Sequence, residues 1–295
     1  MKVCFLSGKG GAGKTSLAAS FVHVLREREK EITISVADCD VECPNLHLLL
    51  ASKLNEGDFE SYEVSAGFKA KINPKKCTKC GKCFSVCMFN AVERLEDGSY
   101  IINRYCEGCF ACSLICPNNA IEKVEEKNGK VFVSNASYFC EHLVWGELFP
   151  GQSASGKLVT EVKKKAFEYK ADVYVVDASA GIGCPVIASL KGCDLCFIVA
   201  EATPSGFSDF LRAVDLSQIL NIPAKVIVNK ANLSEKIKSK IEKVTKEKRA
   251  EVVGSLPFIE ETVRCISELR IPSLEIKEYK EIAEKMLNSV KDSLR

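Results

Sequence analysis

The sequence predicts an α/β fold: a mostly parallel sheet with helices on both faces, interrupted by a small inserted α+β domain. Apolar, β-prone runs alternate with segments of helical periodicity in the first and last parts of the chain. A glycine-rich stretch separates the first strand from the first helix, and a block of eight cysteines interrupts the alternation. With 295 residues, 46% of them hydrophobic, the chain can form one large domain and a small one.

The first elements set the pattern. Residues 2–7 (KVCFLS) predict a strand, because they are apolar and end at glycines, and residues 14–29 predict a helix. Residues 31–37 (EITISVA) predict a second strand, which ends at Asp38. A strand, a glycine loop, a helix and a further strand are typical of a parallel sheet with helical crossovers. Residues 55–75 are polar and break this pattern.

The alternation returns at about residue 157. The expected strands are 173–176, 195–200, 225–228 and 251–256, and the expected helices are 207–220, 234–248 and 274–294. The simplest organisation is one discontinuous domain, 1–61 and 131–295, with an insert at 62–130.

Composition excludes several classes of protein. A net charge of +2 gives no electrostatic footprint for nucleic acid. The sequence contains no run of 18 consecutive apolar residues, so we expect no membrane insertion. It also shows no signal-peptide pattern at its start, so we expect a cytoplasmic protein. In a reducing compartment, sixteen cysteines indicate metal binding and not disulfides.

The glycine-rich stretch predicts a nucleotide site. Residues 8–15 fit G-x-x-x-x-G-K-[ST], in which backbone N–H groups and a helix N-terminus bind phosphates. We expect Lys14 to reach the β- and γ-phosphates and the Thr15 hydroxyl to bind Mg²⁺. A chance glycine turn is the alternative, and the position between a strand and a helix argues against it. The expected nucleotide-binding residues of the loop are Gly8, Gly10, Gly11, Ala12, Gly13, Lys14, Thr15 and Ser16.

The stretch GKGGAGKTS resembles the deviant Walker A loop, KGGxGK[ST], of the MinD-type P-loop ATPases. That group includes MinD, ParA, the nitrogenase iron protein and the Mrp-type iron–sulfur scaffold ATPases. The resemblance implies ATP and Mg²⁺ as cofactors and an ATP-sandwich homodimer. It also implies that Lys9 reaches across the dimer interface to the partner's nucleotide, in the manner of an arginine finger.

Two further segments support the resemblance. ADCDVECPNLHLLL resembles the family's switch I, in which one carboxylate supports Mg²⁺, here Asp38, and the other orients the attacking water, here Asp40. An ordinary turn is the alternative. YVVDASAGIG resembles Walker B with switch II, although relatives often carry a proline there. The likeness implies that Asp177 holds Mg²⁺ through water and that the Gly181 backbone approaches the γ-phosphate.

The resemblance also extends to residues that would contact the adenine base of the nucleotide. Asn229, in VIVNK, matches the family's adenine-reading asparagine, and Pro257, in GSLPF, matches a segment that lies along the base. In all, the likeness covers roughly residues 1–55 and 135–290.

The cysteine block is an internal repeat with an offset of 29 residues. Cysteines spaced by two, two and three residues wrap cubane clusters, with the fourth cysteine of each run serving the other cluster. The block resembles a bacterial-type ferredoxin with two [4Fe–4S] clusters, although Met88 stands where proline usually follows the first run. Two zinc sites are the alternative, but zinc sites use paired C-x₂-C units. The resemblance assigns one cluster to Cys77, Cys80, Cys83 and Cys116, and the other to Cys106, Cys109, Cys112 and Cys87.

Three other cysteines are candidates. Cys184 follows switch II, where the nitrogenase iron protein carries a ligand of its bridging cluster; a small buried residue is the alternative. Cys193 and Cys196 form a C-x-x-C, which binds a shared cluster in Mrp-type scaffolds, but Cys196 lies in an apolar run that predicts a buried strand.

Three functions fit these features. The first is an ATPase that gates electron transfer through the insert to a redox partner. The second is a scaffold or maturation ATPase whose partner is an apo-metalloprotein. The third is a carrier that only binds nucleotide, and Lys14, Asp38, Asp40 and Asp177 together argue against it. Eight ligands at full ferredoxin spacing favour permanent, redox-active clusters and hence the first function.

Overall fold

The computed structural model describes residues 1–51, 54–55, 57–152 and 155–291. They divide into two compact units. The first comprises Met1–Tyr62, Val131–Glu147 and Ser155–Arg295, and the second comprises Glu63–Lys130 and Leu148–Ala154. The cysteine block lies in the second unit, and the insert boundaries at 62–130 stay a prediction.

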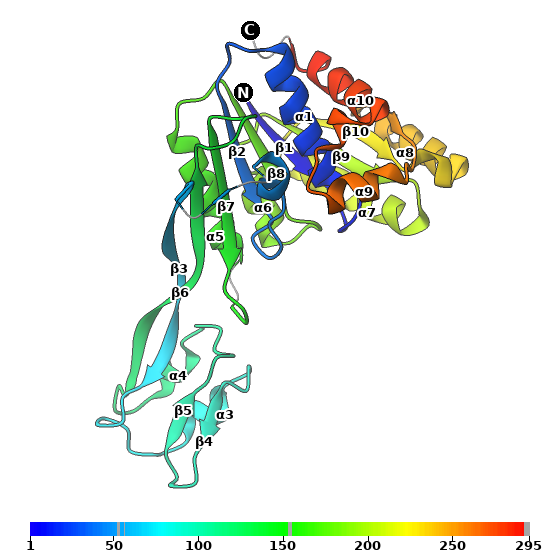
Figure 1. Cartoon of the computed structure of the whole chain (residues 1–295). Helices are drawn as coiled ribbons and strands as arrows, with labels where there is room; N and C mark the ends of the chain where they lie inside the picture. The colour runs from blue at the N-terminus through cyan, green and yellow to red at the C-terminus, as the bar shows by residue number, and fades with distance from the viewer. Residues whose placement is uncertain (52–53, 56, 153–154, 292–295) are drawn as a thin grey trace. The chain divides into compact units, whose positions relative to one another are not determined.

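The predicted α/β fold with a mostly parallel sheet is confirmed. A nine-stranded sheet has the order β11-β10-β9-β1-β8-β2-β7-β6-β3 (Figure 1). The pairs of neighbouring strands from β11 to β7 are all parallel. The strands are β1 (Lys2–Leu6), β2 (Ile34–Cys39), β3 (Phe59–Ile72), β6 (Ile121–Ser134), β7 (His142–Leu148), β8 (Val173–Ala178), β9 (Leu195–Glu201), β10 (Ala224–Asn229) and β11 (Glu251–Leu256).

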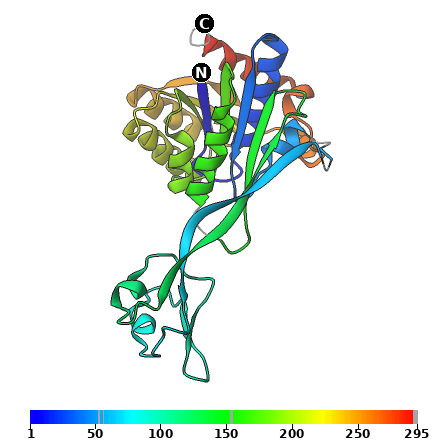
Figure 2. The ribbon, with the colours of Figure 1, turned by 90° about the vertical axis from the view of Figure 1, so that its left-hand side faces the viewer.

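Helices cover both faces of this sheet (Figure 2). One face carries α1 (Lys14–Arg28) and α10 (Lys277–Asn288), and the other carries α5 (Ser155–Glu168), α6 (Cys184–Leu190), α7 (Pro204–Ile219) and α8 (Glu235–Glu247). Under α1, the rings of Phe5, Phe21 and Phe197 pack with centroids 5.3 to 5.8 Å apart. The remaining helical segments are α2 (Leu46–Leu50), η1 (Ala231–Leu233), α9 (Glu261–Ser267) and η2 (Pro272–Leu274). No helix in the described ranges is both long and apolar enough to cross a membrane.

The sequence analysis missed three strands of the nine-stranded sheet: β3, β6 and β7. The first half of β6 (IEKVEEK) is charged and largely exposed, and only its second half is buried, so it lacks the apolar run of a sheet strand. The expected strand at 31–37 begins instead at Ile34, because residues 31–33 are only partly buried or exposed. The other predicted strands agree with the structure to within one or two residues.

The two halves of the second unit have similar local backbone conformations. It contains α3 (Lys82–Val86), α4 (Ala111–Ile115) and an antiparallel pair, β4 (Val92–Arg94) and β5 (Tyr100–Ile102). Positive φ angles recur at the 29-residue offset, at Lys79 and Gly108, Gly81 and Phe110, and Asn90 and Asn119. The sequence repeat is therefore also a repeat of local conformation.

Candidate nucleotide and cysteine sites

The glycine loop lies between β1 and α1, and the end of β10 contacts it through Asn229. The Asn229 side chain donates a hydrogen bond from Nδ2 to the Ala12 carbonyl at 2.8 Å. Gly13 has φ +93°, and a Cβ there would lie 2.3 Å from that nitrogen. Only glycine fits at this position. At the start of the loop, a Cβ on Gly8 would lie 2.4 Å from the Asp209 carbonyl oxygen of α7.

Lys14, Thr15 and Asp177, which the motif resemblances assign to one nucleotide site, contact one another in the structure. Lys14 Nζ lies 2.6 Å from Asp177 Oδ1, and Thr15 Oγ1 donates to Asp177 Oδ2 at 2.7 Å. Lys14 and Asp177 are buried. Burial alone would lower the pKa of Lys14, but the charge and hydrogen bond of Asp177 outweigh it, so the pKa is raised. The lysine is therefore held as a charged ammonium at the base of the loop.

The two switch I carboxylates have different environments. Asp38 is fully buried, and its oxygens accept hydrogen bonds from the backbone N–H groups of Asp40, Asn45 and Leu46 at 2.9 to 3.1 Å. Burial, followed by repulsion from Asp177, raises the pKa of Asp38 from 3.8 to about 7. Asp40 is half-buried, and burial likewise raises its pKa. Asp38 thus holds the start of α2 in place while Asp40 remains accessible.

Lys9 lies against its own chain. Its Nζ is 3.1 Å from Glu201 Oε1 and 3.1 Å from Ser205 Oγ. The other Glu201 oxygen accepts from Lys230 Nζ at 3.1 Å, and Lys230 also donates to the Gly11 carbonyl at 3.0 Å. Burial would raise the pKa of Glu201, but the two ammonium groups hold it below its usual value. Sequence reasoning missed Glu201 and Lys230, because no motif joins them to the loop.

A cleft of about 510 Å³ opens above the loop. Its polar wall includes residues 10–16, Asp40, Ser7 and Asn45. Its apolar wall was not predicted and comes from Leu48, Leu49, Ile266 and Leu269, with the exposed Cys43 beside it. Ile266 lies on α9 and Leu269 just after it, and their helical spacing was the sequence signal that could have indicated this apolar wall.

Gly181, Asn229 and Pro257 were also predicted to contact the nucleotide, but like Gly8 and Asp177 they do not line this cleft. The Gly181 N–H donates to the Ser7 carbonyl at 3.0 Å, which ties switch II to the loop. Asn229 is buried, and its Oδ1 accepts from the Lys230 N–H at 2.9 Å, so both ends of its amide are engaged. Pro257 is exposed. A contact of Asn229 or Pro257 with a base stays a prediction.

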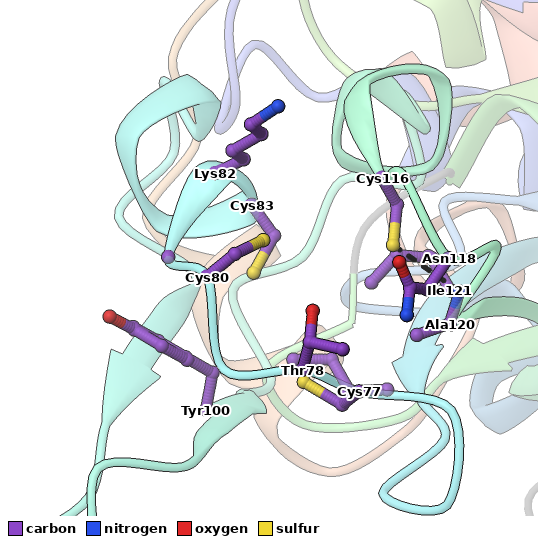
Figure 3. Close-up of a pocket in the computed structure, with 12 residues that line it drawn as sticks. Cys77, Thr78, Cys80, Lys82, Cys83, Tyr100, Cys116, Asn118, Ala120 and Ile121 are labelled. Carbon is purple, nitrogen blue, oxygen red and sulfur yellow. Dashed lines mark hydrogen bonds between the residues drawn. The ribbon is translucent and has the colours of Figure 1, made fainter.

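The first predicted set of four cysteines surrounds one cavity. The thiols of Cys77, Cys80, Cys83 and Cys116 face a common space, which Tyr100 and other residues also line (Figure 3). These are the four residues that the ferredoxin spacing assigns to one cluster. The pKa of Cys83 is raised by burial and by the neighbouring Cys77 and Cys80.

The second set repeats this arrangement in part. Burial raises the pKa of Cys112, and the neighbouring Cys106 and Cys109 add to the shift. Cys87 accepts a hydrogen bond from the Ala91 N–H at 3.4 Å, and the equivalent Cys116 accepts one from the Ala120 N–H at 3.2 Å. Cys87 and Cys116, the fourth cysteines of the two runs, therefore have the same local backbone hydrogen bonding.

The C-x-x-C pair is buried within the first unit. Cys196 lies in β9, and Cys193 donates from its thiol to the Ser189 carbonyl at 3.3 Å. Cys184 is exposed at the first residue of α6. In the described part of the chain, no three His, Cys, Asp or Glu side chains converge closely enough to hold a single metal ion.

Comparison with known proteins identifies the family. The chain matches the family described as the CobQ/CobB/MinD/ParA nucleotide binding domain over residues 3–272. The uncharacterized protein MJ0578 of Methanocaldococcus jannaschii is 37% identical over 235 residues, which cover 79% of each chain. The iron-sulfur cluster carrier protein of Pyrococcus abyssi is 31% identical over 88 residues, or 27% of this chain and 29% of that one.

A solved structure shows the same fold. The septum site-determining protein MinD of Pyrococcus horikoshii, complexed with Mg-ADP, matches with a TM-score of 0.58 and 13% identity. The match covers 98% of this chain and 95% of that one. Because the family match spans most of the sequence, this chain belongs to the CobQ/CobB/MinD/ParA nucleotide-binding domain family of P-loop ATPases.

Proposed function

We propose that this ATPase is an iron–sulfur protein in which nucleotide-driven dimerisation controls electron transfer through the cysteine-rich unit. The observation that carries the proposal is the presence, in one chain, of a complete nucleotide loop and two complete four-cysteine runs. A nucleotide site alone needs no thiols, and an electron carrier alone needs no Lys14–Asp177 pair.

On the nucleotide side, each charged group has a role that its position supports. Lys14 and Thr15 bond to Asp177 at 2.6 and 2.7 Å, and would turn to phosphate and Mg²⁺ when nucleotide binds. Mg²⁺ keeps several waters and takes one or two carboxylates plus phosphate oxygens. Thr15, Asp38 and Asp177 suit that ligand set. Asp40, on the cleft wall, would orient the attacking water.

Dimerisation enters through Lys9. To reach a second chain's nucleotide, its ammonium must exchange Glu201 and Ser205 for phosphate oxygens. The side chain is 30% exposed, so no buried group has to move to release it. Lys9 would thus exchange one anion, the Glu201 carboxylate, for another, the nucleotide phosphate, so the position of this exchange should depend on the charge of the nucleotide.

On the cysteine side, the residues fit two [4Fe–4S] clusters. Soft thiolates select iron–sulfur clusters, and the first set places its four sulfurs around a shared space and not on one point (Figure 3). Backbone N–H groups donate to the sulfurs of Cys77, Cys87 and Cys116, as is usual for cluster ligands. When bound, such clusters supply one-electron transfer at low potential.

The test is an EPR-monitored redox titration of the anaerobically purified holoprotein, with and without MgATP. We expect about eight iron atoms per chain, and midpoint potentials that shift on addition of MgATP. Lys9→Ala should bind nucleotide as a monomer but lose both the dimer and the shift. Equal potentials with and without MgATP would refute control by nucleotide.

A second candidate function is delivery of clusters to an apo-metalloprotein. The observation that favours it is the 88-residue similarity to an iron-sulfur cluster carrier protein. Mixing ⁵⁵Fe-labelled holoprotein with an apo-ferredoxin acceptor separates the two functions. ATP-dependent transfer of label to the apo-acceptor supports delivery. Retained label, together with one-electron reduction of an oxidised holo-ferredoxin by the dithionite-reduced protein, supports electron transfer.

A further inference from the structure

We propose that the two cysteine sets are electronically unequal, and that Cys77, Cys80, Cys83 and Cys116 hold their cluster at the higher reduction potential. This inference rests on the proposed iron–sulfur function. Its consequence is directional: a single electron that enters the unit leaves the second cluster oxidised and resides on the first.

The internal repeat makes the two sites comparable. Asn73 and Asn103 make the same bonds: their N–H groups donate to the carbonyls of Ala120 and Ala91 at 2.7 and 2.8 Å. Their amides donate to Glu122 and Glu93 at 2.6 and 2.5 Å; these two glutamates are 29 residues apart, whereas the two asparagines are 30 apart. With the backbone matched, differences between the sites come from the side chains and from the hydrogen bonds to sulfur.

Hydrogen bonds favour the first site. Within the described ranges, two of its sulfurs accept backbone N–H groups: Cys77 from Lys79 at 3.4 Å and Cys116 from Ala120 at 3.2 Å. The second site receives one such bond, from Ala91 to Cys87 at 3.4 Å. Donors to sulfur stabilise the more negative, reduced cluster and raise its potential.

Charges act in the same direction. Between the first and third ligands the first run carries Lys79 and Lys82, whereas the second carries Gly108 and Ala111 at those places. Lys79 is paired with Asp97 at 3.5 Å and so contributes less. Lys82 is exposed, and its ammonium makes no hydrogen bond or ion pair within the described part of the chain and points away from the four sulfurs (Figure 3).

The second run adds an opposing charge. Glu107 stands where the first run has Thr78, directly after the first ligand. Cys112 of the second set is also buried, whereas the equivalent Cys83 is half-buried. A carboxylate and a less solvated ligand both disfavour the added negative charge of reduction. Through-space effects of exposed charges are screened by salt, so the difference should narrow as ionic strength rises.

The redox step balances with one electron. Dithionite supplies it to the [4Fe–4S]²⁺ holoprotein, and the first cluster becomes [4Fe–4S]⁺ while the second stays [4Fe–4S]²⁺. No bond to a protein ligand forms or breaks. A second electron then reduces the second cluster at a lower potential.

The repeat provides reciprocal variants for the test. In EPR-monitored titrations of the holoprotein we expect two resolved midpoint potentials. Lys82→Ala should lower only the higher one, and Ala111→Lys, which installs the lysine at the equivalent place, should raise only the lower one. Each variant should narrow the gap, and the narrowing should diminish in 1 M salt. An unchanged gap in both variants, or one shared potential in the unmodified protein, would overturn the inequality. Iron content near zero after anaerobic reconstitution would instead overturn the proposed iron–sulfur function itself.

Discussion

Asp177→Asn tests the charge balance beneath the nucleotide loop. The substitution keeps the size of the side chain but removes the negative charge 2.6 Å from Lys14 Nζ. The Lys14 side chain is 6% exposed and that of Asp177 is fully buried, so water cannot replace the lost charge. Breaking a buried ion pair costs about 3–5 kcal/mol. Asp38 and Asp40 also raise the pKa of Lys14, so we expect the lower end of that range, about 3 kcal/mol.

The sole tryptophan makes the measurement specific to the first unit. Trp145 lies in β7 and is 3% exposed, so its fluorescence reports unfolding of the sheet and not of the cysteine-rich unit. Urea titration without nucleotide should show a lower midpoint with an unchanged slope. Asp40→Asn is the matched control, since Asp40 is half-buried and forms no ion pair in the described part of the chain, and it should lose less than about 1 kcal/mol. A loss below about 1 kcal/mol for Asp177→Asn would refute the reasoning.

Three further perturbations follow from the same geometry. Because the pKa of Asp38 is raised from 3.8 to about 7, the folded state binds the proton more tightly, so the free energy of unfolding without nucleotide should fall as pH rises through that window. Asp38→Asn should flatten this dependence in the same urea assay. Gly13→Ala, at φ +93° with a side chain in its way, should abolish ATP binding measured by calorimetry, whereas Gly11→Ala, at φ +76° in open space, should only weaken it through about 1–3 kcal/mol of strain. Glu201→Gln should release the partly exposed Lys9 by about 1 kcal/mol in each chain, and so tighten the proposed ATP-dependent homodimer by about 2 kcal/mol, or about thirtyfold, in sedimentation experiments. Weaker dimerisation in that variant would show that Glu201 does not compete for Lys9.

The parts of the site that could be predicted from the sequence are those marked by short motifs. The motif resemblances placed Lys14, Thr15 and Asp177 at one nucleotide site, and in the structure the two oxygens of Asp177 contact the other two side chains. The repeat of cysteines predicted the set that surrounds the cavity in Figure 3. In both cases short motifs carry the information, although the contact between Lys14 and Asp177 joins residues 163 positions apart.

Long-range contacts of residues that no motif marks could not be predicted in this way. Glu201 lies 192 residues from Lys9, and neither residue carries a local signal of the contact. β3 and β6 were missed because their exposed halves carry charges where a buried strand would carry apolar residues. Asn229 was placed correctly at a strand end, but its amide engages the loop backbone, which no motif specifies.

Electron transfer under nucleotide control is the central claim, and one kinetic measurement tests it most directly. The holoprotein is reduced anaerobically and mixed in a stopped-flow instrument with an oxidised low-potential viologen, with and without MgATP. The account predicts that MgATP changes the rate of viologen reduction, and that Lys9→Ala, which still binds ATP, shows no change. Identical rates with and without MgATP in the unmodified protein, or an undiminished ATP effect in Lys9→Ala, would contradict it.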